Sequence, residues 1–196
     1  SLIRRIKGVP GIEEVVLTSN GHLLADYAGA LAQAGLDGVN ISIDSLRPER
    51  FKAITRGGNI QRVIAGLDAA ITAGIPKIKL NTVAIANFND DELIDLVQFS
   101  VDRGVLLRFI EFMPIGADTI WEGGRCLPAR QIREVLGREW DLEPEGFEVG
   151  AGPARYWRLH PKGSLGSPDD KLPRVGLIAA VTECFCDACN RIRVTA

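Results

Sequence analysis

Strand-like and helix-like segments alternate along the first 113 residues, and this alternation constrains the fold more than any other feature of the chain. Runs rich in β-branched residues and bounded by turn signals predict strands at residues 15–21, 39–44, 78–84 and 107–113. Apolar residues at helical spacing predict helices at 27–34 and 59–73, and a third helix with Asp90 as its N-cap. Strand–helix units with connections this short build a parallel sheet, so we expect an α/β fold.

Polar residues recur at every second position of the predicted strands. Asn40, Ser42 and Asp44 share one face of residues 39–44, whereas the residues between them are apolar. A parallel strand covered on both faces would be apolar on both faces. The same pattern recurs near the ends of the next two strands, at Lys79, Asn81, Glu111 and Met113.

Such polar side chains near the carboxyl ends of strands have two explanations. In a parallel α/β barrel, the inward-pointing side chains at these ends line the active site. In an antiparallel sheet with one wet face, the same alternation reflects only contact with solvent. Because helices separate the strands in the sequence, we favour the barrel, and we expect one cavity to gather Thr18, Ser42, Lys79, Asn81 and Met113.

Three of the four cysteines lie between residues 184 and 189, and Arg191 and Arg193 follow them. Thiolates at the spacing of Cys186 and Cys189 can reach one metal or one iron–sulfur cluster from a single turn. A closed zinc site needs a fourth ligand, and the other candidates, His160 and Cys126, lie far upstream. We therefore expect a metal site beside an anion site, completed by a ligand after residue 196 or by a non-protein ligand. The alternative is a pair of buried thiols.

The composition excludes several classes of function. The chain has 23 Lys and Arg against 25 Asp and Glu, a net charge of −2, so it lacks the basic footprint of a nucleic-acid-binding protein. No apolar run reaches the length of a membrane span, and residues 1–7 lack the apolar core of a secretory signal. Crowded cysteines fit a reducing compartment better than a disulfide framework, so we expect a soluble, cytoplasmic protein.

The strand–helix rhythm ends at Pro114. Residues 115–175 are rich in Gly, Pro and charge, with a predicted helix at 128–136 and a strand at 156–159, and they resemble an appendage. We therefore expect two domains, residues 1–114 and 115–196. Because the chain lacks an initiator methionine, we also expect it to be a piece of a longer protein.

Six segments together resemble one family, the GTP 3′,8-cyclases, which are radical S-adenosylmethionine (SAM) enzymes of molybdenum-cofactor biosynthesis. Any one segment would be a weak match, but their order and spacing are specific. The segments are residues 17–21, 39–46, 51–57, 79–81, 108–114 and 185–193.

The resemblance implies residues 1–114 to be part of an incomplete TIM-like radical SAM barrel, and residues 115–196 to be a cluster-binding extension. Members of this family hold two 4Fe-4S clusters. The first cleaves S-adenosylmethionine to a deoxyadenosyl radical, which abstracts a hydrogen from the ribose of GTP; the second leaves one iron open to the purine. The product is (8S)-3′,8-cyclo-7,8-dihydroguanosine 5′-triphosphate, made in the first step of molybdopterin synthesis. The resemblance also implies a homodimer and a downstream partner, cyclic pyranopterin monophosphate synthase.

The family's motifs assign roles to eight residues of this sequence. Ser42 and Met113 would contact S-adenosylmethionine, and Cys186 and Cys189 would bind the second cluster. The residues expected to contact GTP are Thr18, Lys79, Arg191 and Arg193. These types suit the chemistry, because arginine offers donor forks to phosphate and lysine a point charge.

The sequence departs from the family pattern at both clusters. The three-cysteine motif of the first cluster is missing, since no cysteine precedes Cys126, and the third cysteine of the second cluster would lie beyond Ala196. Cys126 and Cys184 have no family role. We expect pocket or structural roles for Asp44, Asn81, Arg108 and Glu111, and core positions for Tyr156, Trp157 and Phe185.

Three other functions stay open at this point. A radical SAM enzyme with an auxiliary cluster and another substrate, such as a peptide, would share the barrel. A zinc-binding interaction module would need only residues 184–193. The third is a truncated, inactive product.

Overall fold

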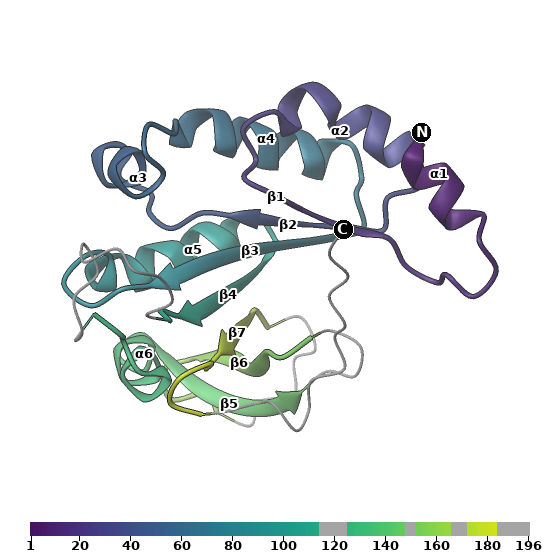
Figure 1. Ribbon diagram of the computed structural model, residues 1–196. Helices are drawn as coiled ribbons and strands as arrows, with labels where there is room; N and C mark the ends of the chain where they lie inside the picture. The colour runs from purple at the N-terminus through teal and green to yellow at the C-terminus, as the bar shows by residue number, and fades with distance from the viewer. Residues whose placement is uncertain (114–124, 148–151, 166–171, 184–196) are drawn as a thin grey trace. The chain divides into compact units, whose positions relative to one another are not determined.

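The computed structural model describes residues 1–113, 125–147, 152–165 and 172–183 (Figure 1). The chain divides into two compact units, Ser1–Thr82 and Val83–Ala196. Parallel strand pairs and packed helices occur in both units, which confirms the predicted α/β class. No helix in the described ranges combines the length and apolar character needed to cross a membrane.

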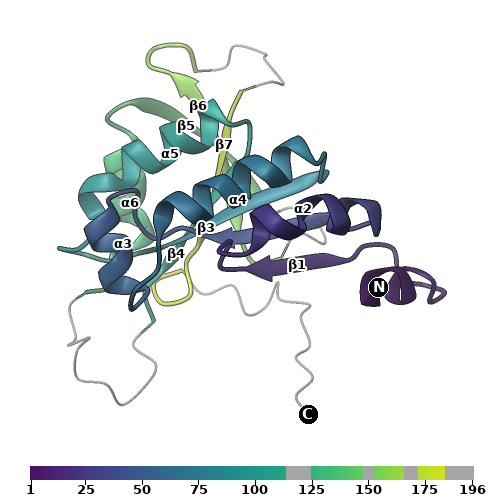
Figure 2. The ribbon, with the colours of Figure 1, turned by 90° about the horizontal axis from the view of Figure 1, so that it is seen from above.

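The first unit consists of three parallel strands with helices on one face. Strands β1, β2 and β3 are neighbours in that order, and α2 and α4 lie side by side over them (Figures 1 and 2). The last two residues of β3 belong to the second unit. In chain order the elements are α1 (Leu2–Lys7), β1 (Val16–Ser19), α2 (Leu24–Gln33), β2 (Gly38–Ser42), α3 (Pro48–Ile54), α4 (Ile60–Thr72) and β3 (Lys77–Ala84).

The apolar stripe of α4 explains which face of the sheet is covered. Val63 and Leu67 of α4 and Val39 and Ile41 of β2 are at most 2% exposed. Ile41 points toward α4, because a Cβ added at Gly21 would lie 2.7 Å from Val63 and 3.1 Å from Ile41. The alternate residues of β2 therefore point to the face that carries no helix in this unit.

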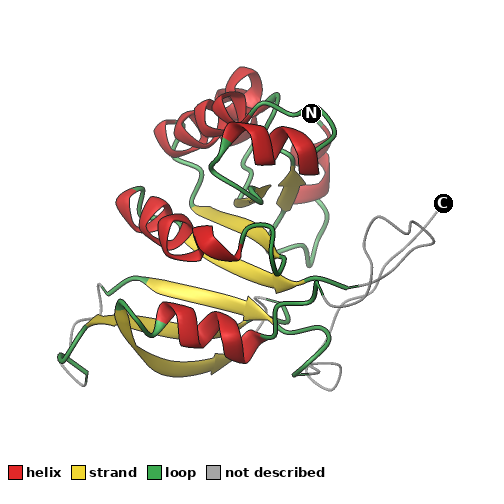
Figure 3. Cartoon of the chain, turned by 90° about the vertical axis from the view of Figure 1, so that its left-hand side faces the viewer, coloured by secondary structure: helices red, strands yellow, loops and turns green. Residues whose placement is uncertain are grey.

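The second unit joins one parallel strand pair to an antiparallel hairpin. Strand β4 pairs in parallel with β7, β7 pairs antiparallel with β6, and β6 pairs antiparallel with β5. Helix α5 packs against β4, α6 packs against β5, and the two helices contact each other (Figure 3). The elements are η1 (Asp90–Glu92), α5 (Leu93–Asp102), β4 (Leu106–Glu111), α6 (Ala129–Leu136), β5 (Trp140–Phe147), β6 (Arg155–Pro161) and β7 (Arg174–Ile178).

Asp90 does not cap the helix that follows it. It lies within the short 3₁₀ turn η1, whose N-cap is Asn89. The buried Asn89 side chain accepts a hydrogen bond from the Ile85 amide (2.8 Å) and donates one to the Val83 carbonyl (2.8 Å). The side chain of Asn89, one residue earlier than predicted, therefore fixes this loop from the inside.

Residues 115–175 are not a simple appendage. Strand β7, which begins at Arg174 within this segment, lies beside β4, and β6 in turn lies beside β7. The described second half of the segment is therefore part of the same sheet as β4. The domain boundary between residues 114 and 115 stays a prediction.

Candidate functional site

Polar side chains from three adjacent strands form rows on the helix-free face of the first unit. Thr18 of β1 is in register with Asn40 of β2, which is in register with Lys79 of β3. The Asn40 side-chain amide donates a hydrogen bond to Thr18 Oγ1 (3.4 Å). Ser42 and Asn81 form the next row toward the carboxyl ends of the strands. We call these five residues the polar rows.

The polar rows are accessible but held on a rigid support. Thr18 is exposed and the other four residues are half-buried, whereas Val39, Ile41 and Leu80, which alternate with them, are fully buried. Beyond Ser42, the Ile43 amide donates to the Asn81 carbonyl (2.9 Å), and the buried Thr82 hydroxyl donates to the Ile43 carbonyl. These bonds fix the row of Ser42 and Asn81 at the end of the parallel sheet, which is where α/β folds place ligands.

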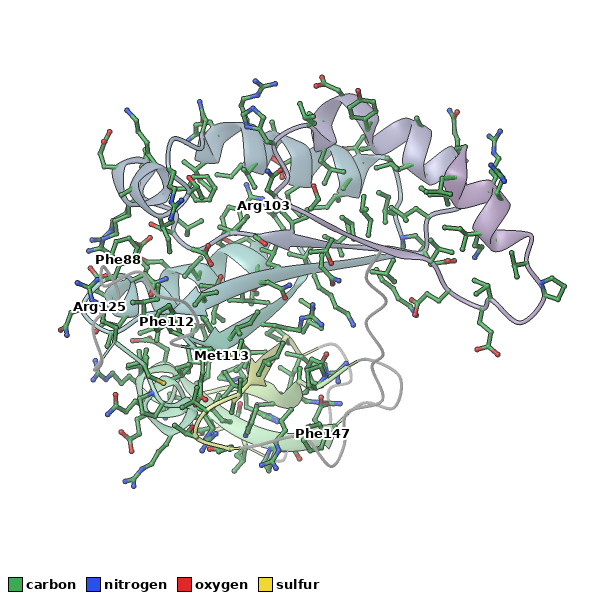
Figure 4. All side chains as sticks on the ribbon, viewed as in Figure 1. Phe88, Arg103, Phe112, Met113, Arg125 and Phe147 are labelled. Atoms are coloured by element: carbon green, nitrogen blue, oxygen red, sulfur yellow. The ribbon has the colours of Figure 1, made fainter. Side chains whose placement is uncertain are left out.

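Met113 belongs to the second unit, two residues after the end of β4. It is 42% exposed, as several other large apolar side chains of the described structure are (Figure 4). The predicted convergence of Met113 with Ser42 on one cavity stays a prediction.

Glu111 does not belong to the polar face that sequence alternation assigned to it. It shares its face of β4 with Leu107 and Phe109, both fully buried, and it is itself 1% exposed. Its carboxylate accepts hydrogen bonds from the backbone amides of Ala129 (2.7 Å), Val181 (2.8 Å) and Thr182 (2.9 Å), and from the Thr182 hydroxyl. The role of Glu111 in the described structure is therefore structural.

These hydrogen bonds decide the charge of Glu111. Burial pushes the pKa of its carboxyl group upward, but the donors from Thr182, Val181 and Ala129 outweigh burial and hold the pKa below its usual range. The group is thus a buried anion at neutral pH, and the four donors that stabilise its charge are neutral amides and a hydroxyl.

Two arginines hold Glu183, the residue directly after Thr182. Glu183 accepts a hydrogen bond from Arg133 Nη2 of α6 (2.6 Å), and Arg155 Nη1 of β6 lies 3.6 Å from its other carboxylate oxygen. The Arg133 guanidinium also lies over the Trp157 ring, 5.3 Å from its centre. Sequence analysis missed Thr182, Glu183 and Arg133; the position of Glu183 directly before Cys184 was the available signal.

Comparison with known proteins agrees with the resemblance found in the sequence. The radical SAM superfamily profile matches residues 1–100, and the profile of Molybdenum Cofactor Synthesis C matches residues 105–196. The chain belongs to the radical SAM superfamily. Together the two matches cover both compact units of this radical SAM chain.

Curated relatives of this radical SAM chain carry the name GTP 3′,8-cyclase. The protein of Pelotomaculum thermopropionicum is 42% identical over 196 residues, covering 100% of the chain and 58% of the relative. That of Pseudomonas putida is 45% identical over 195 residues, covering 99% and 56%, and that of Listeria monocytogenes is 43% identical over 197 residues, covering 100% and 56%. The chain therefore spans little more than half the length of these relatives.

Four of the expected ligand residues lie outside the described residues: Cys186, Cys189, Arg191 and Arg193. The same holds for Cys184 and Phe185. Within the described ranges, no group of three or more metal-ligating side chains occurs. Cys126 is a free thiol there, and burial together with the Glu111 charge raises its pKa, which disfavours the thiolate that a metal requires.

The other candidates have structural positions. His160 is 1% exposed, and its Nε2 lies 2.8 Å from a Glu143 carboxylate oxygen, so its imidazole is engaged within the hairpin. Tyr156 is fully buried, as expected for a core residue, whereas Trp157 is half-buried. Arg108 is 7% exposed, and its side chain packs across Gly176, where an added Cβ would lie 2.8 Å from Arg108 and 2.9 Å from Tyr156.

Proposed function

We propose that this radical SAM chain is part of a GTP 3′,8-cyclase, which converts GTP to (8S)-3′,8-cyclo-7,8-dihydroguanosine 5′-triphosphate. One observation carries the proposal. Relatives with that name match 99–100% of the chain. In support, Thr18 and Lys79, which the family motif assigns to GTP, lie in one row of a parallel sheet. The reaction belongs to the first step of molybdenum-cofactor biosynthesis.

In this proposal the polar rows bind substrate and orient it. Lys79 supplies a positive charge on the middle of the sheet face, suited to an anionic nucleotide. Asn40 donates its hydrogen bond to Thr18 Oγ1, so the Thr18 hydroxyl hydrogen remains to donate to a ligand. Ser42, one row nearer the carboxyl ends of the strands, and Met113 would contact S-adenosylmethionine, and Arg191 and Arg193 would hold phosphate oxygens.

The cluster chemistry requires cysteines that this chain holds only in part. Cys186 and Cys189 suit a 4Fe-4S cluster by donor type and spacing, and would supply two of the thiolates of the second cluster. The first cluster, which supplies the electron that cleaves S-adenosylmethionine, receives no ligand from residues 1–125, since these contain no cysteine. We further propose a cytoplasmic homodimer whose product passes to a cyclic pyranopterin monophosphate synthase.

Isothermal titration of GTP against the complete, cluster-loaded protein tests the substrate assignment. Lys79→Ala, Arg191→Ala and Arg193→Ala should each weaken binding by about 1.5–3 kcal/mol for each charge-assisted hydrogen bond removed, roughly 10- to 150-fold in affinity. Iron and sulfide content should stay unchanged, because neither lysine nor arginine ligates iron.

Lys77→Ala is the matched control. Lys77 lies on the same strand and face as Lys79 but at the amino end, where it is paired with Glu14 (2.7 Å), so its removal should leave GTP affinity unchanged. Unaltered affinity in all three test variants would contradict the proposal. A wild type that binds peptides but not nucleotides would favour a radical SAM enzyme with another substrate.

A further inference from the structure

Two independent contacts hold three consecutive residues immediately before the cysteine motif. The first is made by the Glu111 carboxylate, which accepts hydrogen bonds from the backbone amides of Val181 and Thr182 and from the Thr182 hydroxyl. Because Glu111 is 1% exposed and ends strand β4, it ties residues 181 and 182 to the sheet. We call residues 181–183 with their partners the tail anchor.

The second contact holds Glu183 through the cations Arg133 and Arg155, at 2.6 and 3.6 Å. Both contacts involve helix α6. Glu111 also accepts a hydrogen bond from the backbone amide of Ala129, the first residue of α6, and Arg133 lies on the same helix. Arg133 Nη1 is buried and has no hydrogen-bond partner among the described residues, so a donor remains beside the end of the anchor. Strand β4, helix α6 and residues 181–183 thus form one hydrogen-bonded unit.

The covalent chain limits how far the cysteines can lie from this unit. A fully extended chain advances at most about 3.6 Å per residue, so the Cα atom of Cys186 cannot lie more than about 11 Å from that of Glu183. For Cys189 the limit is about 22 Å. A shift of residues 181–183 therefore changes the positions that the thiolates of Cys186 and Cys189 can reach.

We infer that the tail anchor positions the second cluster, with Glu111 and Arg133 as positioning residues that act through residues 181–183 on Cys186 and Cys189. The inference rests on the proposed function only in requiring that these cysteines bind a cluster. Outer residues that orient metal ligands commonly affect metal retention by about 10- to 100-fold. A buried carboxylate that serves four donors is a costly way to fill a core, which favours such a positioning role over simple packing.

The test uses the complete protein, anaerobically reconstituted with both clusters, and two isosteric substitutions. Glu111→Gln turns one acceptor oxygen into a donor that faces other donors, and Glu183→Gln removes the charge that holds Arg133. Glu134→Gln is the control, because Glu134 lies on the same helix in an exposed pair with Arg130 (2.8 Å). We measure iron release to a chelator, the electron paramagnetic resonance of the reduced second cluster, and thermal stability.

Both test variants should lose the iron of the second cluster about 10-fold faster than the wild type and change its resonance signature. The first cluster, identified by its response to S-adenosylmethionine, and the Glu134→Gln control should behave as in the wild type. Unchanged iron release and resonance in Glu183→Gln would overturn the inference, even if Glu111→Gln fails to fold or melts earlier. A wild type that holds both clusters but binds no GTP contradicts the proposed function and not the anchor.

Discussion

At the scale of single residues, Glu145 shows how the hairpin concentrates charge. Its carboxylate accepts hydrogen bonds from Arg158 Nη2 (2.6 Å) of the neighbouring strand and from Arg174 Nε (2.5 Å) of β7. Burial pushes the pKa of Glu145 upward, but the two guanidinium groups outweigh it and hold the pKa below the ordinary 4.5. One carboxylate therefore links three strands of the sheet.

Glu145→Gln should make the stability of the protein less dependent on pH. A lowered pKa in the folded state means that the Glu145 charge contributes fully above about pH 4.5 and loses its contribution as the pH falls through the folded-state pKa. At pH 7 the variant should lose about 1–2 kcal/mol in free energy of unfolding, and this difference should shrink below pH 4.5. Urea unfolding at several pH values measures it, with the exposed Glu139→Gln as control. A difference that grows toward acid pH would contradict the prediction.

Residue by residue, sequence alternation located side chains best inside strands. Lys79 and Asn81 lie within β3 and share a face with Asn40 and Ser42 through the register, as the period of two predicted. The prediction failed at Glu111, because its polarity was taken as the mark of an accessible face, whereas the period of two places it on the buried face with Leu107 and Phe109. The backbone amides of residues 181 and 182 stabilise the buried carboxylate of Glu111. They are distant from Glu111 in the sequence, so no local pattern predicts the contact.

At the scale of elements, the contact between α2 and α4 depends on a glycine. A Cβ added at Gly66 would lie 2.5 Å from the Gly21 carbonyl oxygen and 3.0 Å from the Leu24 Cβ, so the helix α4 backbone could not stay in place. At Gly29, inside α2, an added Cβ would meet no atom within 4 Å. The two glycines are equivalent for helix propensity but opposite in packing.

Gly66→Ala should therefore destabilise the protein by about 1–3 kcal/mol, because overpacking exceeds the gain in helix propensity. Gly29→Ala should stabilise it by about 0.5–1 kcal/mol, because alanine favours the helix and finds open space. Urea unfolding midpoints of the complete protein compare the two variants. Equal stability of both would mean that α2 and α4 are not in close contact at Gly66.

Strand β5 and helix α1 were not predicted from the sequence, because their residues do not show the usual pattern of a strand or a helix. Strand β5 contains Pro144 and Gly146, two residue types that are typical of loops. The strand tolerates them because its register with β6 shifts between these two residues, as in a β-bulge. Helix α1 has no buried residue, and its 6 residues are too few for a helical period to be detected in the sequence. The helices predicted from clear stripes, at α2 and α4, are present within a few residues of the expected bounds.

At the scale of the whole molecule, the order of strands and helices predicted the α/β class, and six sequence segments predicted the radical SAM family. The parallel pairing of β4 with β7 could not be predicted in this way, because more than 60 residues, including α6, β5 and β6, separate the two strands in the sequence. Local periodicity identifies elements, whereas long-range pairing depends on packing that no single segment encodes.

Residues 1–196 alone should form no 5′-deoxyadenosine from S-adenosylmethionine under reducing, anaerobic conditions after iron–sulfur reconstitution. No cysteine precedes Cys126, so the polypeptide cannot hold the cluster that supplies the electron, and the protein then offers only a pocket. Reproducible 5′-deoxyadenosine formation by this polypeptide would contradict the prediction. Mass spectrometry of the quenched reaction decides it.

Isotope transfer from GTP in the complete, cluster-loaded protein tests most sharply whether this chain acts on GTP. Joining C3′ to C8 requires the hydrogen on C3′ to leave, so GTP deuterated at C3′ should transfer deuterium into 5′-deoxyadenosine and give the 3′,8-cyclised nucleotide. Both products are measured by mass spectrometry after reaction with S-adenosylmethionine and a reductant. We predict deuterated 5′-deoxyadenosine and cyclised product together; undeuterated 5′-deoxyadenosine with GTP recovered unchanged, in protein that retains both clusters, would contradict the assignment of GTP as the substrate.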